Sequence, residues 1–200
     1  MLRNGLVILA GLAAMAPAAA AQTVEAGATS RAAAAKPWVG FVAEAALEFG
    51  GDAFATVNFD DGSTQDVRTG QGLTVSVGGQ LRPSVDSPLG LRGTVGFKFV
   101  GTAADNANIF LTRLPVEVVG TYRLPQDAWV GAGFVHHALT KFWGGGLGPD
   151  VDFTGGNGAT VEAGWRWLGV SYTSMRYTDD TDAEYDASVF GIFFTSAFSR

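Results

Sequence analysis

The 200-residue chain contains no cysteine, so neither a disulfide nor thiol chemistry can be part of its structure or function. Charged residues make up only 16% of it, well below the roughly one quarter that is usual for soluble domains. The formal net charge is −6 and no basic stripe is present to neutralise phosphates, which argues against a nucleic-acid partner. No stretch approaches the roughly 20 continuous apolar residues of a transmembrane helix, so any membrane crossing must use strands.

The N-terminal segment has the three parts of a secretory signal peptide. A short basic region precedes the apolar stretch Gly5 to Ala14, and the small residues Ala18 to Ala21 provide an Ala-x-Ala cleavage site. We therefore expect residues 1–21 to be removed as a signal peptide. Residues 22–36 are rich in alanine and show no periodicity, which indicates a flexible periplasmic leader. A single domain would then occupy residues 37–198.

Alternation of apolar with charged or small side chains is the strongest pattern in the chain. Between residues 38 and 49, one parity is entirely apolar and the other carries Glu44 and Glu48. Residues 91–99 and 160–167 repeat the pattern. Successive side chains of a strand point to opposite faces, so each run has one apolar and one charged face. A membrane barrel needs this arrangement, with its apolar face towards lipid.

Eight such runs predict an all-β fold, an eight-stranded antiparallel up-and-down transmembrane β-barrel. The runs cover residues 38–59, 65–82, 89–101, 109–122, 128–140, 158–168, 170–177 and 187–198. The runs are about ten residues long or slightly longer, the length that a tilted strand needs to cross the hydrocarbon layer. The first two form one long hairpin, and we expect a tight turn around Leu168 and Gly169. Pro115 lacks a backbone N–H, so a bulge is predicted in the fourth run.

The last run carries Phe190, Ile192, Phe194 and Phe198 on one parity, close to the C-terminal strand that outer-membrane proteins share. Together with the segments at residues 112–117, 131–137 and 170–177, it resembles the small outer-membrane β-barrel domain group related to the OmpA and OmpX barrels. The resemblance implies residence in the outer membrane of a Gram-negative bacterium, as a monomer surrounded by lipid and lipopolysaccharide. It also implies that the outer-membrane assembly machinery engages the C-terminal strand. Functions in this group range from structural anchoring to adhesion and narrow conductance.

Charged residues on the inward parity form the first candidate site. They are Glu44, Glu48, Arg82, Arg92, Lys98, Arg113, Glu117, Glu162 and Arg166. Eight strands leave an interior only wide enough for side chains to fill, and ions buried there must pair. One interpretation is a salt-bridged plug that holds the barrel shut. The other is a gated or very narrow pore, in which pairs such as Glu117 with Arg113, or Glu162 with Arg166, rearrange.

His136 and His137 form a second candidate site. Lipid A deacylases are eight-stranded barrels with a His-x-Ser element, whereas no serine stands two residues after either histidine here. Adjacent strand residues point to opposite faces, so only one histidine can face a given site. A hydroxyl nucleophile also needs a base within reach and an orienting acid behind it. We therefore expect rim histidines, no enzyme activity and no cofactor.

Arg176 breaks the alternation, because it shares a face with Val170 and Tyr172. It is expected either to reach lipid phosphates from the outer end of its strand or to be turned inward by a bulge. Loop carboxylates could bind divalent cations, although no calcium-loop spacing is present and solvated loops explain them equally well. They are Asp52, Asp60, Asp61, Asp66, Asp150, Asp152, Asp179, Asp180, Asp182, Glu184 and Asp186.

The sequence thus favours a non-enzymatic outer-membrane barrel with a structural or surface-interaction role in the cell envelope. A narrow or gated channel for small solutes or ions is the first alternative, and a lipid A-modifying enzyme is the second. No metal site is predicted.

Overall fold

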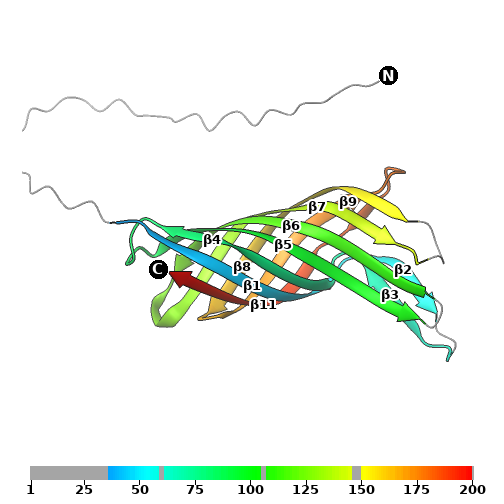
Figure 1. Ribbon diagram of the computed structural model, residues 1–200, viewed down its shortest axis with the longest axis horizontal. Coiled ribbons are helices and arrows are strands. Elements are labelled where there is room, and N and C mark those ends of the chain that lie inside the picture. The colour runs from blue at the N-terminus through cyan, green and yellow to red at the C-terminus, as the bar shows by residue number, and fades with distance from the viewer. Residues whose placement is uncertain (1–35, 59–60, 105–106, 146–149, 200) are drawn as a thin grey trace, which may run out of the picture. The chain divides into compact units, whose positions relative to one another are not determined.

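Eight strands form a closed antiparallel barrel in the computed structural model, which describes residues 36–58, 61–104, 107–145 and 150–199 (Figure 1). The barrel strands are β1 (Trp38–Gly50), β4 (Gly72–Arg82), β5 (Leu89–Ala104), β6 (Ala107–Arg123), β7 (Ala128–Trp143), β8 (Val151–Trp165), β9 (Leu168–Thr178) and β11 (Val189–Ser199). Each pairs with the next along the chain, and the pairing of β1 with β11 closes the barrel. The predicted all-β, eight-stranded, up-and-down barrel is therefore confirmed.

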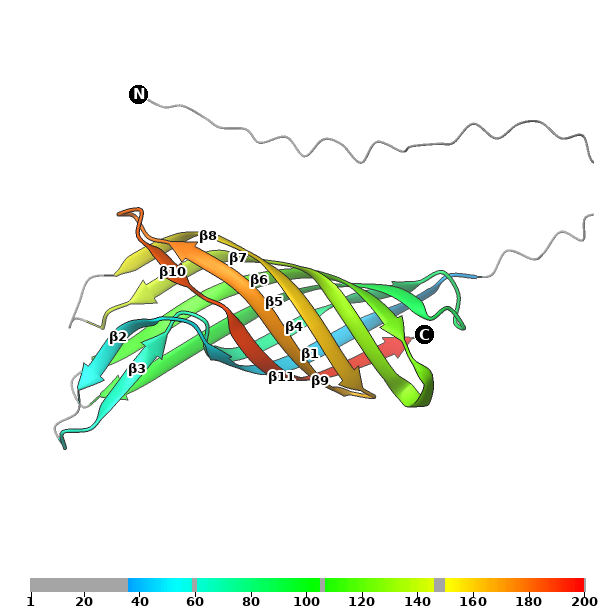
Figure 2. The same cartoon turned by 180° about the vertical axis from the view of Figure 1, so that it is seen from behind.

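The two ends of the barrel differ in their connections. The terminal end holds the start of β1, the end of β11 and the three-residue 3-10 turn η1 (Pro125–Asp127). At the opposite end, which we call the hairpin end, β2 (Ala53–Asn58) pairs with β3 (Thr64–Arg68), and β10 (Glu184–Asp186) pairs with β9 (Figure 2). No helix among the described residues is long and apolar enough to cross a membrane.

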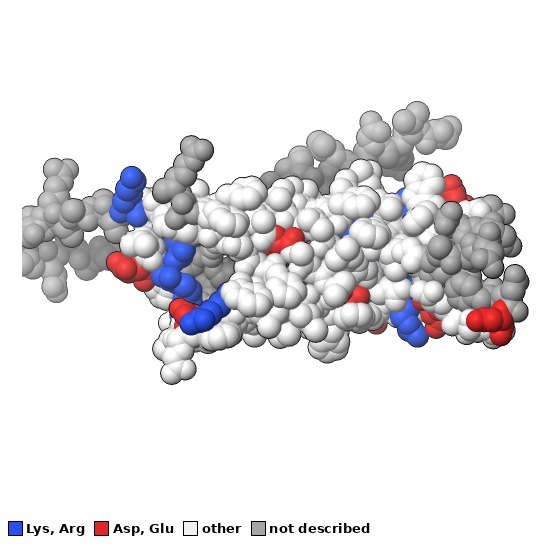
Figure 3. Space-filling model, turned by 60° about the horizontal axis from the view of Figure 1, so that its bottom comes forward, with Lys and Arg blue, Asp and Glu red and all other residues white. Residues whose placement is uncertain are grey.

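Large apolar side chains point outward from all eight barrel strands. One exposed example per strand, in chain order, is Val39, Val75, Leu91, Val116, Phe134, Val161, Val170 and Phe190. Figure 3 shows the effect on one face, where charged side chains gather towards the two ends and few lie in the broad band between. The alternation in the sequence thus produces an apolar outer belt.

The interior is charged in its middle and apolar towards the hairpin end. The apolar cluster is made of Val67, Ile109, Leu111, Val135, Phe142, Phe153, Met175, Tyr177 and Ala187. Val67 belongs to β3 and is fully buried, so the β2–β3 hairpin contributes a side chain to this cluster. Phe153 packs between the rings of Tyr177 and Tyr185, with centroids 5.9 and 5.8 Å away. The hairpin end is therefore filled by packed side chains.

The irregular pairing between β6 and β7 lies beside the position that the sequence indicated. Thr112 pairs with Lys141, whereas Leu114 pairs with Ala138, so β7 carries one extra residue. Leu139 lies in this bulge with a φ of 50°. Pro115 itself pairs in register with His137. The predicted bulge at Pro115 is therefore wrong in position, because the neighbouring strand absorbs the extra residue.

The turn between β8 and β9 consists of Arg166 and Trp167, rather than lying around Leu168 and Gly169 as predicted. Trp165 pairs with Leu168, and Gly164 with Gly169, so Gly169 is a strand residue. A Cβ atom on Gly169 would lie 2.5 Å from the ring of Phe193, so this glycine makes room for an inward aromatic ring. The glycine at position 169, which the sequence pattern indicated as part of a turn, is therefore needed for packing against Phe193.

Candidate functional site

Four charged side chains from four strands meet in the middle of the barrel, and we call them the Arg92 cluster. Arg92 of β5 lies 3.2 Å from Glu44 of β1, 3.3 Å from Glu117 of β6 and 2.6 Å from Glu162 of β8, measured between nitrogen and oxygen atoms. The Arg92 side chain is only 5% exposed. The alternation of the strands turns all four inward, and the ion pairs join them across the interior.

The Arg92 cluster contains three carboxylates and one guanidinium. Arg92 donates from Nη2 to both carboxylate oxygens of Glu162, at 2.7 and 2.6 Å. Charge-assisted hydrogen bonds of this kind are among the stronger ones in proteins. Removing one partner of a buried ion pair leaves an uncompensated charge, which is strongly destabilising. The Arg92 cluster therefore joins β1, β5, β6 and β8 to one another across the interior of the barrel.

A second polar level lies between the Arg92 cluster and the apolar cluster. Lys98 Nζ lies 3.0 Å from Glu48 Oε1, and the Thr74 hydroxyl donates to Glu48 Oε2 at 2.5 Å. The fully buried Arg113 donates from Nη1 to the Thr69 carbonyl at 2.5 Å and from Nη2 to the Gln71 carbonyl at 2.6 Å. Arg113 thus fixes the chain between β3 and β4 to the barrel wall.

The ion pairs suggested by sequence proximity are wrong. Glu117 lies 3.3 Å from Arg92 rather than beside Arg113, and Glu162 also contacts Arg92 rather than Arg166. A strand rises about 3.3 Å per residue, so side chains four positions apart are roughly 13 Å apart along it. Direct pairing therefore joins residues on different strands at the same level.

Two of the nine predicted interior charges lie at the terminal end instead of within the network. Arg166 is 56% exposed, because it occupies the β8–β9 turn, and its Nε lies 3.3 Å from Asp127 Oδ2. The expectation that it belongs to the interior network is thus corrected. Arg82 stacks over the ring of Trp38, with its guanidinium carbon 3.8 Å from the centroid, and donates to the Val85 carbonyl at 3.4 Å.

His136 and His137 point to opposite faces of β7. His137 turns inward, where its Nδ1 shares a short hydrogen bond with the Tyr177 hydroxyl. His136 is exposed on the outer face, and its Nδ1 lies 2.8 Å from Asn157 Oδ1. Two positions along from His136, on the same strand, stands Ala138, which has no hydroxyl. An oriented histidine is therefore present without a hydroxyl two residues further along, where the His-x-Ser element of lipid A deacylases has its serine.

Arg176 and the loop carboxylates lie near the hairpin end. Arg176 is exposed on the outer face, and its Nη1 lies 3.3 Å from Glu184 Oε2. Asp179 accepts hydrogen bonds from both the backbone N–H and the hydroxyl of Thr181, at 2.8 and 2.7 Å. The part of the chain that the structure describes holds no group of three or more side chains suited to a metal ion. Asp60 lies outside the described residues.

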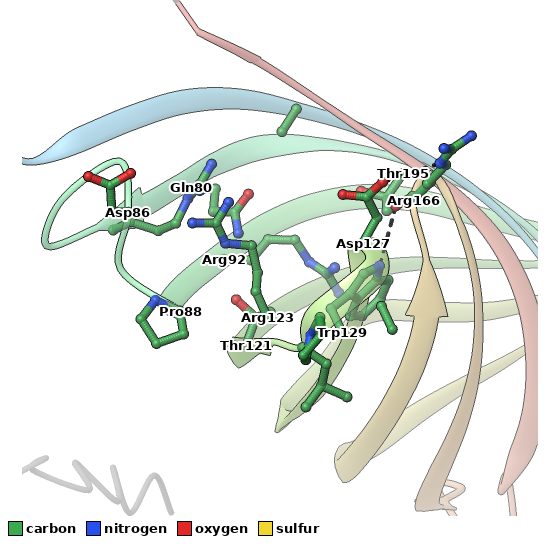
Figure 4. Close-up of a pocket in the computed structure, with 15 residues that line it drawn as sticks. Gln80, Asp86, Pro88, Arg92, Thr121, Arg123, Asp127, Trp129, Arg166 and Thr195 are labelled. Atoms are coloured by element: carbon green, nitrogen blue, oxygen red, sulfur yellow. Dashed lines mark hydrogen bonds and ion pairs between the residues drawn. The ribbon is translucent and has the colours of Figure 1, made fainter.

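A cavity of about 790 Å³ opens at the terminal end of the barrel, and we call it the vestibule (Figure 4). Four arginines line it, together with Trp129 and two aspartates, Asp86 and Asp127. The arginines are Arg82, Arg92, Arg123 and Arg166. A much smaller cavity of about 60 Å³ lies deeper and is lined by Glu44, Glu117 and Glu162 among others. Because Arg92 lines the vestibule and its carboxylate partners line the deeper cavity, the Arg92 cluster lies between the two.

The sequence pattern did not predict the vestibule, because most of its lining side chains come from strand ends and turns rather than from strand interiors. Arg82, Arg123 and Arg166 all lie at the terminal end, and this common position was the available signal. Trp129, which also lines the vestibule, turns inward and lies 5.7 Å from the Phe193 ring. Comparisons with protein-family models, curated proteins and solved structures found no match to this chain.

Proposed function

We propose that this protein is an outer-membrane barrel of a Gram-negative bacterium, with a structural or surface-interaction role and no enzymatic activity. The observation that carries the proposal is the combination of an apolar outer belt with a charged interior. Soluble barrels have the opposite arrangement, because their apolar side chains fill the core and their charges face water. An apolar surface that encircles the molecule far exceeds the patches that monomeric soluble proteins expose.

Closure of the barrel supports the same proposal. Each barrel strand is paired on both sides, so the ladder has no open edge within the barrel. Each unpaired backbone N–H or C=O group costs several kcal/mol in hydrocarbon, and a closed barrel avoids this cost because its strands have no unpaired edge. The exposed Tyr122, Trp165 and Trp167 gather near the terminal end, as interfacial aromatic residues do in membrane barrels.

The proposed orientation places the terminal end in the periplasm and the longer hairpins outside the cell. Short turns on the periplasmic side and longer loops outside are typical of bacterial outer-membrane barrels. In this orientation the hairpin end lies among lipopolysaccharide. The assembly machinery would engage β11, whose outward face carries Phe190, Ile192, Phe194 and Phe198. These features agree with the resemblance to the OmpA and OmpX group.

We further propose that the barrel is closed to solutes. The apolar cluster fills the hairpin end. Towards the terminal end it is followed by the level of the Lys98–Glu48 ion pair and then by the level of the Arg92 cluster. Each level joins side chains from different strands, so opening a passage would require several buried ion pairs to separate. A structural or surface-interaction role needs no passage.

Expression in a Gram-negative host, followed by membrane fractionation and planar-bilayer recording, tests the proposal. We expect the protein in the outer-membrane fraction, with the mass of a mature chain whose first residue is Gln22. We expect the purified barrel to produce no discrete channel openings. Recovery as a soluble monomer in detergent-free buffer would contradict the membrane location. Reproducible openings that change in a Glu117→Ala variant would contradict the closed interior.

A narrow or gated channel is the second candidate function, and the two interior cavities favour it. The vestibule leads to Arg92, and the deeper cavity lies directly behind the same ion pairs. Arg92 and its three carboxylates lie between the two cavities, so a passage through the barrel would require these ion pairs to separate. The recordings described above separate this candidate from a closed barrel. The lipid A-modifying alternative gains no support, because Ala138 replaces the hydroxyl that it would need.

A further inference from the structure

We propose that the vestibule is a binding site for a small organic molecule that carries at least two oxyanion groups, phosphate or carboxylate. The site uses Arg82 and Arg123, whose guanidinium groups belong to β4 and β6. This inference concerns a site in the barrel mouth and does not depend on the proposed membrane location or on whether the barrel conducts.

The charge of the vestibule is the first reason for the inference. Of its four arginines, Arg92 is paired with glutamates and Arg166 with Asp127. Arg82 and Arg123 have no carboxylate within 4 Å among the described residues. Two arginines without a carboxylate partner therefore line one cavity. Asp86 lines it too and forms no ion pair among the described residues, so one positive charge remains in excess and attracts anions.

The unused hydrogen-bond donors of these arginines are the second reason. A guanidinium has five N–H donors, arranged as a fork that matches the oxygens of carboxylate and phosphate groups. Arg82 donates only to the Val85 carbonyl, and its buried Nε has no partner among the described residues. Arg123 donates from Nη2 to the carbonyls of Val85 and Ser87, at 2.8 and 3.0 Å. Its Nε and Nη1 donate no hydrogen bond within the described part of the chain, so they are available to a ligand.

These contacts also position the two guanidinium groups. Stacking on Trp38 holds Arg82 in place, and two carbonyls of the turn after β4 hold Arg123. Both arginines bond to the same carbonyl, that of Val85, so their side chains converge on the same turn. Two cations fixed in this way can each bind one oxyanion group of the same ligand, so they suit a ligand with two such groups better than one with a single charge. Binding also orders little of the protein, because both side chains are already held in place.

The size and lining of the vestibule indicate a small organic molecule rather than a lone ion. Its volume of about 790 Å³ lies within the roughly 300–1,000 Å³ typical of small-molecule sites. Leu124, Pro125 and Trp129 supply apolar surface next to the charged groups. Figure 4 shows Trp129 on the side of the cavity towards Arg166, with Arg123 between it and Pro88. An anionic ligand with a carbon skeleton can therefore use both kinds of surface.

Calorimetric titration of the detergent-solubilised full chain tests the inference, with pyrophosphate and citrate as probes. We expect one bound anion per barrel, and an affinity that falls at least tenfold in the Arg82→Gln/Arg123→Gln double variant. Arg68→Gln is the matched control, because Arg68 is an exposed arginine of β3 at the hairpin end. Its affinity should stay within twofold of that of the unsubstituted protein.

The outcomes distinguish the sources of the anion and the alternatives to a site. Binding of pyrophosphate alone would assign phosphate ligands to the vestibule, and binding of citrate alone would assign carboxylates. An equal loss in the Arg68→Gln control would indicate nonspecific charge attraction and overturn the inference, as would the absence of binding by both probes. Because Arg82 also stacks on Trp38, the single Arg123→Gln variant and circular dichroism of each variant separate lost binding from lost folding. A folded Arg123→Gln variant with unchanged affinity would overturn the inference too.

Discussion

Among the described residues, Arg92 forms more ion pairs than any other side chain. It holds Glu44, Glu117 and Glu162, which come from three other strands. In an Arg92→Met variant these carboxylates would face one another without a cation. We expect the free energy of unfolding to fall by about 3–5 kcal/mol, the usual cost of removing one partner of a buried ion pair. Urea unfolding in detergent micelles measures this change, and an unchanged midpoint would contradict the bracing role.

The three carboxylates of the Arg92 cluster should differ in their contributions. Glu162 is 4% exposed and 2.6 Å from Arg92, whereas Glu117 is 23% exposed and 3.3 Å away. We therefore expect Glu162→Gln to lower the free energy of unfolding more than Glu117→Gln does, because a shorter and drier contact is screened less by water. The same urea titration compares the two variants. Equal losses would mean that the carboxylates share the arginine evenly.

Within a single element, the turn that follows β9, the carboxylate of Asp179 stabilises the local backbone. The pKa of Asp179 lies below its usual value, chiefly because the Thr181 hydroxyl donates a hydrogen bond to its carboxylate. The backbone N–H groups of Thr181 and Ala183 lower this pKa further. A lowered pKa means that the ionised form stabilises the turn. This stabilisation is present above the ordinary aspartate range and is lost as the pH falls through the lowered pKa.

We therefore predict that this turn loosens on acidification. The amide chemical shifts of Thr181 and Ala183 should titrate with a midpoint below about 3.9, the ordinary aspartate value. An Asp179→Asn variant, which cannot ionise, should show no such step at these two amides. A midpoint at or above the ordinary value would contradict the hydrogen-bonded arrangement.

Strand number and the inward or outward direction of most side chains were predictable from the sequence, because period-two alternation encodes both. The bulge at Leu139, the turn at Arg166 and the inward Val67 were not predictable. Each depends on cross-strand register or on packing in the interior, as Gly169 illustrates by facing the Phe193 ring. The residues of the Arg92 cluster were predictable, but their pairing was not, because alternation gives a direction and no cross-strand register.

At the scale of the whole molecule, the outer belt predicts how the barrel responds to charge on its surface. Val95 lies in the belt of β5, 51% exposed, opposite Val77 and Val116 of the neighbouring strands. If lipid covers this belt, a Val95→Lys substitution buries a charge in hydrocarbon. The free energy of unfolding in lipid vesicles should then fall by about 2–4 kcal/mol, the cost of a lysine near the bilayer midplane.

Val85 provides the matched control for this substitution. It is exposed to a similar extent, 58%, but it lies in the turn at the terminal end, beyond the strands. A Val85→Lys variant should change the free energy of unfolding by no more than about 1 kcal/mol, as expected near the membrane interface. Water solvates a surface lysine at either position, so a barrel that functions in water would tolerate both substitutions equally. A large difference between the two variants in vesicles therefore requires a lipid-covered belt, and equal, small effects would contradict the membrane location.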